Sequence, residues 1–306
     1  MLSVSKIRTR FSKVSPNVQG MLWMALAGLI FASFMAIVRH VGTTMNPVQV
    51  SFLRYALGLA FMLPFFLRLN LADLRSARFG LHAVRGILHA IGVMAWFYAM
   101  SRIPIAEVTA IGFTAPVFAT IGAALFLGEA VRARRIIAVV LGLVGAVVIL
   151  RPGVSEIDPG ALAMLIAAPI FAVADLISKV LTRQETGPAV VAYLSVFVTL
   201  TIMGPALYVW RTPTVEEWLL MITTAGLATL GHLCMVQGVK VAEVSALQPV
   251  KFLQLAWAAL IGYAAFAEIP EYSTWIGSAI IVSSISYIAH REVVARKQAH
   301  KNPKND

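Results

Sequence analysis

Apolar residues form ten long runs along this chain, and short polar segments separate them. The runs lie at 21–38, 48–66, 80–101, 105–127, 136–150, 161–179, 189–209, 218–238, 244–266 and 274–290. A helix that crosses a bilayer needs about 20 mostly apolar residues, so every run is of spanning or near-spanning length. The intervening segments are short and rich in proline, glycine and charge. The pattern predicts an all-α integral membrane protein with ten transmembrane helices.

Composition supports a membrane environment and excludes several other classes. Hydrophobic residues make up 59% of the 306 positions and charged residues only 13%, whereas soluble domains carry about a quarter charged residues. The lone Cys234 excludes an internal disulfide framework and a multi-cysteine zinc site. The net charge of +11 resides in the short segments without interleaved aromatics, so we expect no nucleic-acid partner. No metal site and no cofactor are predicted.

The distribution of cations predicts the orientation of the chain. If the N-terminus is cytoplasmic and ten helices span, 18 of the 25 Lys and Arg residues fall on the cytoplasmic side. Four fall on the opposite side, and Arg54, Arg85 and Lys251 lie within runs. Because short cytoplasmic segments of inner-membrane proteins are enriched in Lys and Arg, we expect a multi-pass protein of a bacterial-type inner membrane with both termini in the cytoplasm.

Three sequence echoes indicate an internal repeat. Residues near 31–39, 46–48 and 106–110 recur near 171–179, 187–189 and 242–246, at offsets between 136 and 141. Each half then has five runs, and an odd number places the two halves upside-down relative to each other. Inverted repeats are typical of secondary transporters with a site near the midplane. We expect four parts, namely a cytoplasmic segment 1–19, a first half 20–152, a second half 160–291 and a basic cytoplasmic tail 292–306.

Five stretches of the chain match the pattern of one known family, namely 110–118 and 127–129 in the first half and 248–249, 257–263 and 266–268 in the second. On these stretches the chain resembles, over residues 20–292, the EamA-type carriers of the drug/metabolite transporter superfamily. The resemblance implies ten helices in an inverted 5+5 arrangement around a central cavity. It leaves the substrate open, because members of this family move amino acids, riboflavin, S-adenosylmethionine and metallophores. Lys251 departs from the family pattern, in which an apolar or neutral residue is expected there.

Ionisable residues inside the third run are the first candidates for a substrate site. His82, Arg85, His89 and Trp96 share one helical face. Charged groups in the hydrocarbon cost about 2.5–3.5 kcal/mol on insertion scales, so they normally face a cavity or a partner. An alternative is that His82 and Arg85 only cap the cytoplasmic end of the helix. We expect Arg85, His89 and Trp96 to line the cavity.

The ninth run supplies a second polar row. Gln248 and Lys251 lie on either side of Pro249, which removes a backbone donor and frees a carbonyl at membrane depth. We expect Gln248, Lys251 and Trp257 to face the substrate, although a packing kink with Lys251 paired to an acid is an alternative. Pro116 is a similar helix-kink candidate in the fourth run.

Further charges are candidates for coupling or gating. Asp175 and Lys179 are four residues apart and can pair within one helix. Glu107 and Glu243 occupy equivalent places in the two halves, where an acid also favours a helix N-terminus. Arg54 in the second run needs the cavity or an acid such as Glu107.

These features favour a secondary transporter that works by alternating access. No GxxxxGK[ST] motif is present, so this chain carries no P-loop for ATP. The partners expected are a small-molecule substrate and the lipid bilayer, with a monomer or a homodimer as the assembly. An excess of cations over acids favours a neutral planar solute (riboflavin-like) or a carboxylate-bearing one (amino-acid-like). Alternatives are an S-adenosylmethionine or metallophore carrier of the same fold, an integral-membrane enzyme, and a non-transporting membrane subunit; the short loops argue against an enzyme.

Overall fold

The computed structural model describes residues 15–66, 78–127, 133–154, 156–242 and 244–301. Within these residues the chain forms twelve helices and no strand. The helices are α2 (Pro16–Val41), α3 (Pro47–Phe66), α4 (Phe79–Arg102), α5 (Ile105–Gly112), α6 (Ala115–Leu127), α7 (Ala133–Leu150), α8 (Pro159–Leu181), α9 (Gly187–Tyr208), α10 (Val215–Val241), α11 (Val244–Lys251), α12 (Leu253–Phe266) and α13 (Tyr272–Lys301). The all-helical expectation is confirmed for these residues.

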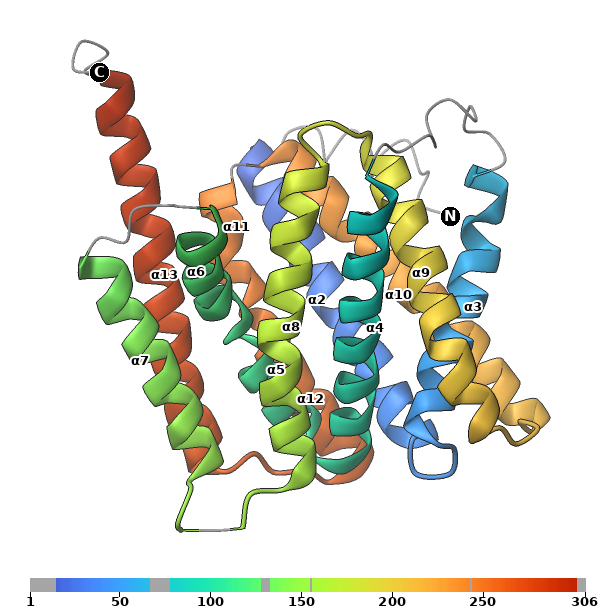
Figure 1. Ribbon diagram of the computed structural model, residues 1–306. Coiled ribbons are helices and arrows are strands. Elements are labelled where there is room, and N and C mark those ends of the chain that lie inside the picture. Colours follow the sequence, from blue (N-terminus) through green and yellow to red (C-terminus); the bar gives the residue numbers. More distant parts are fainter. Residues whose placement is uncertain (1–14, 67–77, 128–132, 155, 243, 302–306) are drawn as a thin grey trace, which may run out of the picture.

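The helices form a bundle with two distinct ends (Figure 1). Helix α2 begins and α13 finishes at the same end of the bundle, which we call the upper end. The opposite, lower end carries the connections 42–46, 209–214 and 267–271. Several helices begin with side-chain caps, including Asp158 before α8 and a capping box between Thr214 and Glu217 before α10. These caps satisfy backbone N–H groups that a helix cannot satisfy itself.

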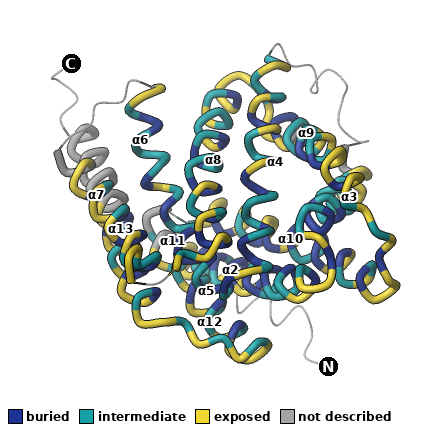
Figure 2. The backbone as a smooth tube through the Cα atoms, turned by 60° about the horizontal axis from the view of Figure 1, so that its bottom comes forward, coloured by how far each residue is buried: buried dark blue, intermediate teal, exposed yellow. Residues whose placement is uncertain are grey.

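The helices are long and apolar enough for a membrane. Among the described residues, seven helical segments meet the length and hydropathy of a membrane span, and 136–150 forms a shorter apolar helix. Large hydrophobic side chains such as Leu22, Ile87, Val140 and Leu233 are exposed on the outside of the bundle, and Figure 2 shows exposed positions along the outward faces of the helices. Water would disfavour so much exposed apolar surface, whereas lipid chains do not. The chain is therefore an integral membrane protein.

Two of the predicted helices are interrupted. The run 105–127 forms α5 and α6, which are separated at Phe113 and Thr114, and the run 244–266 forms α11 and α12, which are separated at Phe252. At the first break, the Thr114 hydroxyl donates to the carbonyl of Ile111 at 2.6 Å. The sequence predicted kinks at Pro116 and Pro249, whereas the structure places the breaks at Phe113–Thr114 and Phe252, where local hydrogen bonds of this kind replace the regular helical ladder. The two breaks lie in corresponding runs of the two halves.

The proline residues lie close to these breaks. Pro116 is the second residue of α6, where the missing N–H would have no helical acceptor in any case. Pro249 lies inside α11, three residues before the break at Phe252. The Phe252 N–H donates instead to the carbonyl of Pro249 at 3.3 Å.

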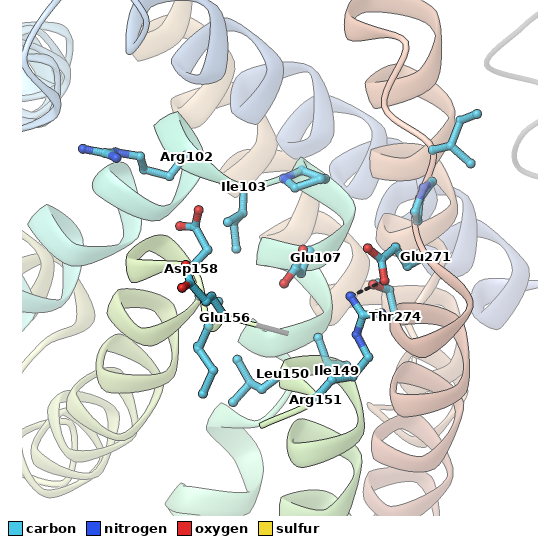
Figure 3. Close-up of a pocket in the computed structure, with 15 residues that line it drawn as sticks. Arg102, Ile103, Glu107, Ile149, Leu150, Arg151, Glu156, Asp158, Glu271 and Thr274 are labelled. Atoms are coloured by element: carbon cyan, nitrogen blue, oxygen red, sulfur yellow. Dashed lines mark ion pairs between the residues drawn. The ribbon is translucent and has the colours of Figure 1, made fainter. Parts of the chain in front are cut away.

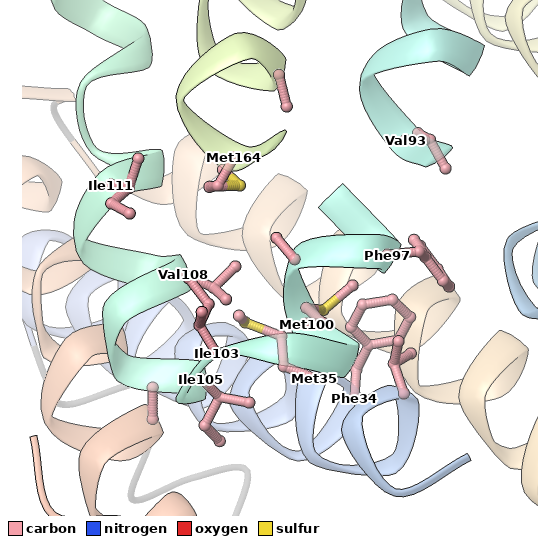
Figure 4. Packing of buried hydrophobic residues seen from close by; sticks show 14 of the residues in the cluster. Phe34, Met35, Val93, Phe97, Met100, Ile103, Ile105, Val108, Ile111 and Met164 are labelled. Atoms are coloured by element: carbon pink, nitrogen blue, oxygen red, sulfur yellow. The ribbon is translucent and has the colours of Figure 1, made fainter. Parts of the chain in front are cut away.

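The core is built where helices of the two halves interlock. The most extensive helix contacts join α2 with α10, α4 with α8 and α7 with α13, so each pair takes one helix from either half. Figure 4 shows the buried side chains around the junction of α4 and α5, including Phe34, Met35, Phe97, Met100 and Ile105, all of which are less than 2% exposed. The two halves share one continuous core rather than forming two separate ones.

Glycines bring α7 and α13 into close contact. A Cβ atom at Gly145 would lie 2.8 Å from the carbonyl oxygen of Gly277, and one at Gly277 would meet the Gly145 carbonyl in return. Without side chains at these positions the two backbones pack directly, as small residues allow in membrane helices. By contrast, a Cβ at Gly204 on α9 meets nothing within 4 Å.

We therefore expect Gly277→Leu to destabilise the folded protein in detergent, because the new side chain must push α13 away from α7. Overpacking of this kind costs about 1–3 kcal/mol. The thermal midpoint of purified protein measures the effect, with Gly204→Leu as the control in open space. Equal midpoints for the two variants would contradict the close packing of α7 on α13.

Candidate functional site

Polar and aromatic side chains from five helices meet in the middle of the bundle. This central cluster consists of Phe31 on α2, Arg54 and Tyr55 on α3, Arg85, His89 and Trp96 on α4, Phe171 and Asp175 on α8, and His232 on α10. Four of these helices form the α2–α10 and α4–α8 pairs described above. The fifth, α3, packs on α9 and α10.

Direct contacts organise the cluster around His89. Its Nε2 atom lies 3.2 Å from the hydroxyl of Tyr55, and its ring lies 5.1 Å from that of Phe171. Trp96 packs edge-on against Phe171 at 6.2 Å. The guanidinium of Arg54 lies over the Tyr55 ring at 4.1 Å, within the range of a cation–π interaction.

Positive groups outnumber acids in the central cluster. Arg54 and Arg85 are both close enough to act electrostatically on His89. Among the described residues, Asp175 is the carboxylate that acts on Arg85. The cluster therefore combines aromatic walls with an excess of cationic groups.

The arginines are only partly satisfied by the protein. Arg85 is 7% exposed, and its Nη1 donates to the carbonyl of Val190 on α9 at 3.0 Å. Its Nε atom is buried and has no hydrogen-bond partner among the described residues. Asp175 and His232 retain exposed surface although helices surround the cluster. The cluster thus contains a buried, unused arginine donor together with polar residues that keep exposed surface.

The structure separates one member of the predicted stripe from the others. Arg85, His89 and Trp96 lie in the central cluster, together with Arg54 and Asp175 from other helices. His82 instead lies 2.5 Å from the carboxylate of Glu185, in the segment after α8, and its ring stacks on Tyr193 at 4.4 Å. His82 therefore contacts Glu185 and Tyr193 near the upper end and lies apart from the central cluster.

The ninth run contributes no described side chain to the central cluster, although its sequence predicted three substrate-facing residues. Lys251 ends α11 and makes no hydrogen bond or ion pair within the part of the chain that the structure describes, so neither Asp175 nor Glu107 is its partner. Trp257 is half-buried against the core, and its indole N–H has no partner among the described residues. The side chain of Gln248 and the whole of Glu243 lie outside the described residues.

Two further predicted residues lie away from the centre. Lys179 is exposed near the end of α8. Glu107 lies in a pocket at the lower end and is not the partner of Arg54. Both remain candidates for coupling or gating.

Sequence reasoning missed Tyr55, Phe171 and His232. His232 lies within an apolar run, so the cost of a buried ionisable group could have identified it as it identified His89. Phe171 occurs in one of the repeat echoes but was not connected with a site. No periodicity within one helix could have placed Tyr55, because its contact with His89 depends on how α3 packs on α4.

Ion pairs connect the two halves at the lower end. Arg39 on α2 donates to Glu268 at 2.9 Å, and the other carboxylate oxygen of Glu268 accepts from the N–H of Ile105 at 3.1 Å. Arg151 pairs with Glu271 in the same region. Arg39 and Glu268 have side chains only 18% and 10% exposed, so the pair is shielded from water.

Arg211, in the connection between α9 and α10, makes hydrogen bonds with residues of the first half. It pairs with Glu217 and donates to the carbonyl of Thr44 at 2.9 Å, and the Gln49 amide donates to the Arg211 carbonyl at 2.6 Å. The hydrogen bond to Glu217 raises the pKa of Arg211. We call Arg39–Glu268 and Arg151–Glu271, the two pairs that join the halves, the lower-end ion pairs.

A pocket of about 380 Å³ lies beside these ion pairs (Figure 3). The start of α5, the end of α7, the start of α8 and the segment before α13 enclose it. Its charged lining consists of Arg102, Glu107, Arg151, Glu156, Asp158 and Glu271. Both halves contribute to the walls, so the shape of the pocket depends on how the halves are placed.

The fold and the central cluster define a class of membrane carrier, and comparison with known proteins identifies the family. The model of the EamA-like transporter family matches residues 18–151 and again residues 158–289. The chain belongs to the EamA-like transporter family. It is thus a carrier of small metabolites in a bacterial inner membrane and not an enzyme.

Individual relatives cover nearly the whole chain. A riboflavin transporter of Vibrio cholerae serotype O1 is 31% identical over 280 residues, which are 90% of this chain and 94% of that protein. An S-adenosylmethionine uptake transporter of Rickettsia bellii is 27% identical over 89% of this chain and 94% of its own. A protein of known crystal structure has the same fold, with a TM-score of 0.58, 19% identity, and coverage of 87% and 96% of the two chains.

Proposed function

We propose that this carrier moves a planar, neutral or carboxylate-bearing metabolite by alternating access, with the central cluster as its substrate site. The observation that carries the proposal is the composition of the cluster. Aromatic rings of Phe31, Trp96 and Phe171 surround an excess of cationic groups, and Arg85 keeps an unused donor. Stacking on the rings suits a planar solute, and the arginine donors suit carbonyl or carboxylate oxygens.

The same charges argue against a cationic substrate. Arg54 and Arg85 both repel a sulfonium or ammonium centre, and Asp175 is the carboxylate available to offset them within the described residues. At an effective dielectric constant of about 20, two like charges 4 Å apart repel each other by on the order of 4 kcal/mol. Riboflavin, named for one relative, therefore fits better than S-adenosylmethionine, named for another. A metallophore is the alternative substrate to a planar, neutral or carboxylate-bearing metabolite.

For the architecture we propose ten spans in two inverted halves, 20–152 and 160–291, flanked by cytoplasmic segments 1–19 and 292–306. The helix pairs support this arrangement. Exchanging corresponding helices of the halves converts the α2–α10 pair into the α8–α4 pair, and it converts the α7–α13 and α3–α9 pairs into themselves. A twofold axis in the membrane plane has this effect.

Alternating access would proceed by rocking one half against the other. In the structure the lower-end ion pairs tie the halves together, whereas Asp175 and His232 keep accessible surface. We infer that the lower end is external and closed in this conformation. Asp175, Lys179, Glu107 and Glu243 are the coupling or gating candidates, and the gradient that drives transport would act on such groups. The assembly would be a monomer or a homodimer.

Riboflavin uptake by proteoliposomes tests the substrate class. We expect wild-type protein to accumulate radiolabelled riboflavin and not S-adenosylmethionine. His89→Leu and Trp96→Ala should each lower riboflavin uptake about tenfold or more, because they remove a polar and an aromatic wall of the site. His40→Leu, at the exposed end of α2, is the control and should transport normally.

Two results would contradict the proposal. Accumulation of S-adenosylmethionine in preference to riboflavin would overturn the substrate class. Normal uptake by both His89→Leu and Trp96→Ala would mean that the central cluster only packs the helices.

Topology is tested separately with reporter fusions. Because cations gather on the cytoplasmic side, a fusion after Arg183 should report cytoplasm, and fusions after Asp158 and Glu217 should report the external side. A cytoplasmic reading at Asp158 would be incompatible with the ten-span arrangement.

A further inference from the structure

His232 is a polar residue of the central cluster whose role the charge excess alone does not explain. It lies on α10, with its ring edge-on against Phe31 on α2 at 5.0 Å. Arg54 acts on it electrostatically, and it acts in turn on His89. The residue is exposed although α10 packs on both α2 and α3. His232 therefore keeps exposed surface within the central cluster.

One hydrogen bond fixes which nitrogen of His232 is free. Its Nδ1 atom lies 2.7 Å from the carbonyl oxygen of Ala228, one turn earlier on α10. A carbonyl oxygen can only accept, so Nδ1 carries the proton and donates it. In the neutral imidazole, Nε2 is then an acceptor with an available lone pair. Within the described residues no donor occupies that atom.

The neighbouring arginines supply the opposite kind of group. The buried Nε–H of Arg85 has no acceptor among the described residues. Arg54 contacts the face of Tyr55 and has no carboxylate partner in the described part of the chain. The cluster thus offers donors from two arginines and an acceptor from His232, between walls formed by Phe31 and Phe171.

We propose that His232 determines specificity by accepting a hydrogen bond from a ring N–H of the solute while Arg54 and Arg85 donate to the adjacent carbonyl oxygens. The site would then select heteroaromatic solutes with an imide or lactam edge, rather than planar solutes in general. This inference rests on the function proposed above and narrows its substrate class. A site that is built to bond an N–H discriminates against an analogue without it, because its acceptor is left unpaired.

Competition between two flavins tests this assignment directly. Unlabelled riboflavin and 3-methylriboflavin, in which a methyl group replaces the imide N–H, compete with radiolabelled riboflavin for uptake into proteoliposomes. For the wild type we expect the methylated compound to compete about tenfold less well or worse. His232→Phe keeps the ring on Phe31 but lacks the acceptor, so the two competitors should become equal within about twofold.

Two matched variants separate hydrogen bonding from packing. His232→Gln places an amide oxygen near the position of Nε2 and should restore part of the preference. His40→Phe makes the same ring replacement at the end of α2 and should keep the wild-type preference. Each protein is compared at equal reconstituted amounts.

The outcomes separate a failure of the His232 hydrogen bond from a failure of the proposed riboflavin transport. A wild type that takes up no riboflavin would overturn the proposed function and this inference with it. A wild type that takes up riboflavin but accepts 3-methylriboflavin equally well would overturn the inference alone, without any variant. An unchanged preference in His232→Phe would have the same meaning.

Discussion

The cost of placing arginine in hydrocarbon is the constraint on which this structure depends. Arg54 and Arg85 lie within apolar helices, and neither reaches a carboxylate of the described residues at ion-pair distance. Because lipid cannot solvate a guanidinium, both must point inward. Helices α2, α4, α8 and α10 gather around them, and the α2–α10 and α4–α8 pairs enclose the same central cluster. A substrate with carbonyl or carboxylate oxygens could complete the solvation of these groups.

The helices could be predicted from the sequence because hydropathy and helix length depend on consecutive residues. The ten apolar runs coincide closely with helices or helix pairs in the structure, and the two halves recognised by the family model follow the repeat. The breaks at Phe113–Thr114 and Phe252 were not predicted at those positions. They depend on local hydrogen bonds such as that of Thr114 and lie three residues away from the nearest proline in one case.

The site was predictable only as far as single-helix patterns reach. The spacing of Arg85, His89 and Trp96 predicts one shared helical face, and in the structure all three residues lie in the central cluster. The same spacing also placed His82 on that face, but in the structure His82 pairs with Glu185 at the upper end and is not part of the central cluster. Contacts between helices, such as Tyr55 with His89 and Phe31 with His232, have no signature within either sequence segment. Lys251, the residue that departed from the family pattern, has no protein partner among the described residues.

The lower-end ion pairs allow a direct test of alternating access, because they join the two halves that are proposed to move apart. Cys234 is the only cysteine, so a Cys234→Ala background can carry Arg39→Cys and Glu268→Cys alone. A short, cleavable thiol cross-linker between these two positions should abolish uptake, and cleavage of the linker should restore it in the same vesicles. Full uptake by quantitatively cross-linked protein would contradict the account, because the lower end would then not need to open.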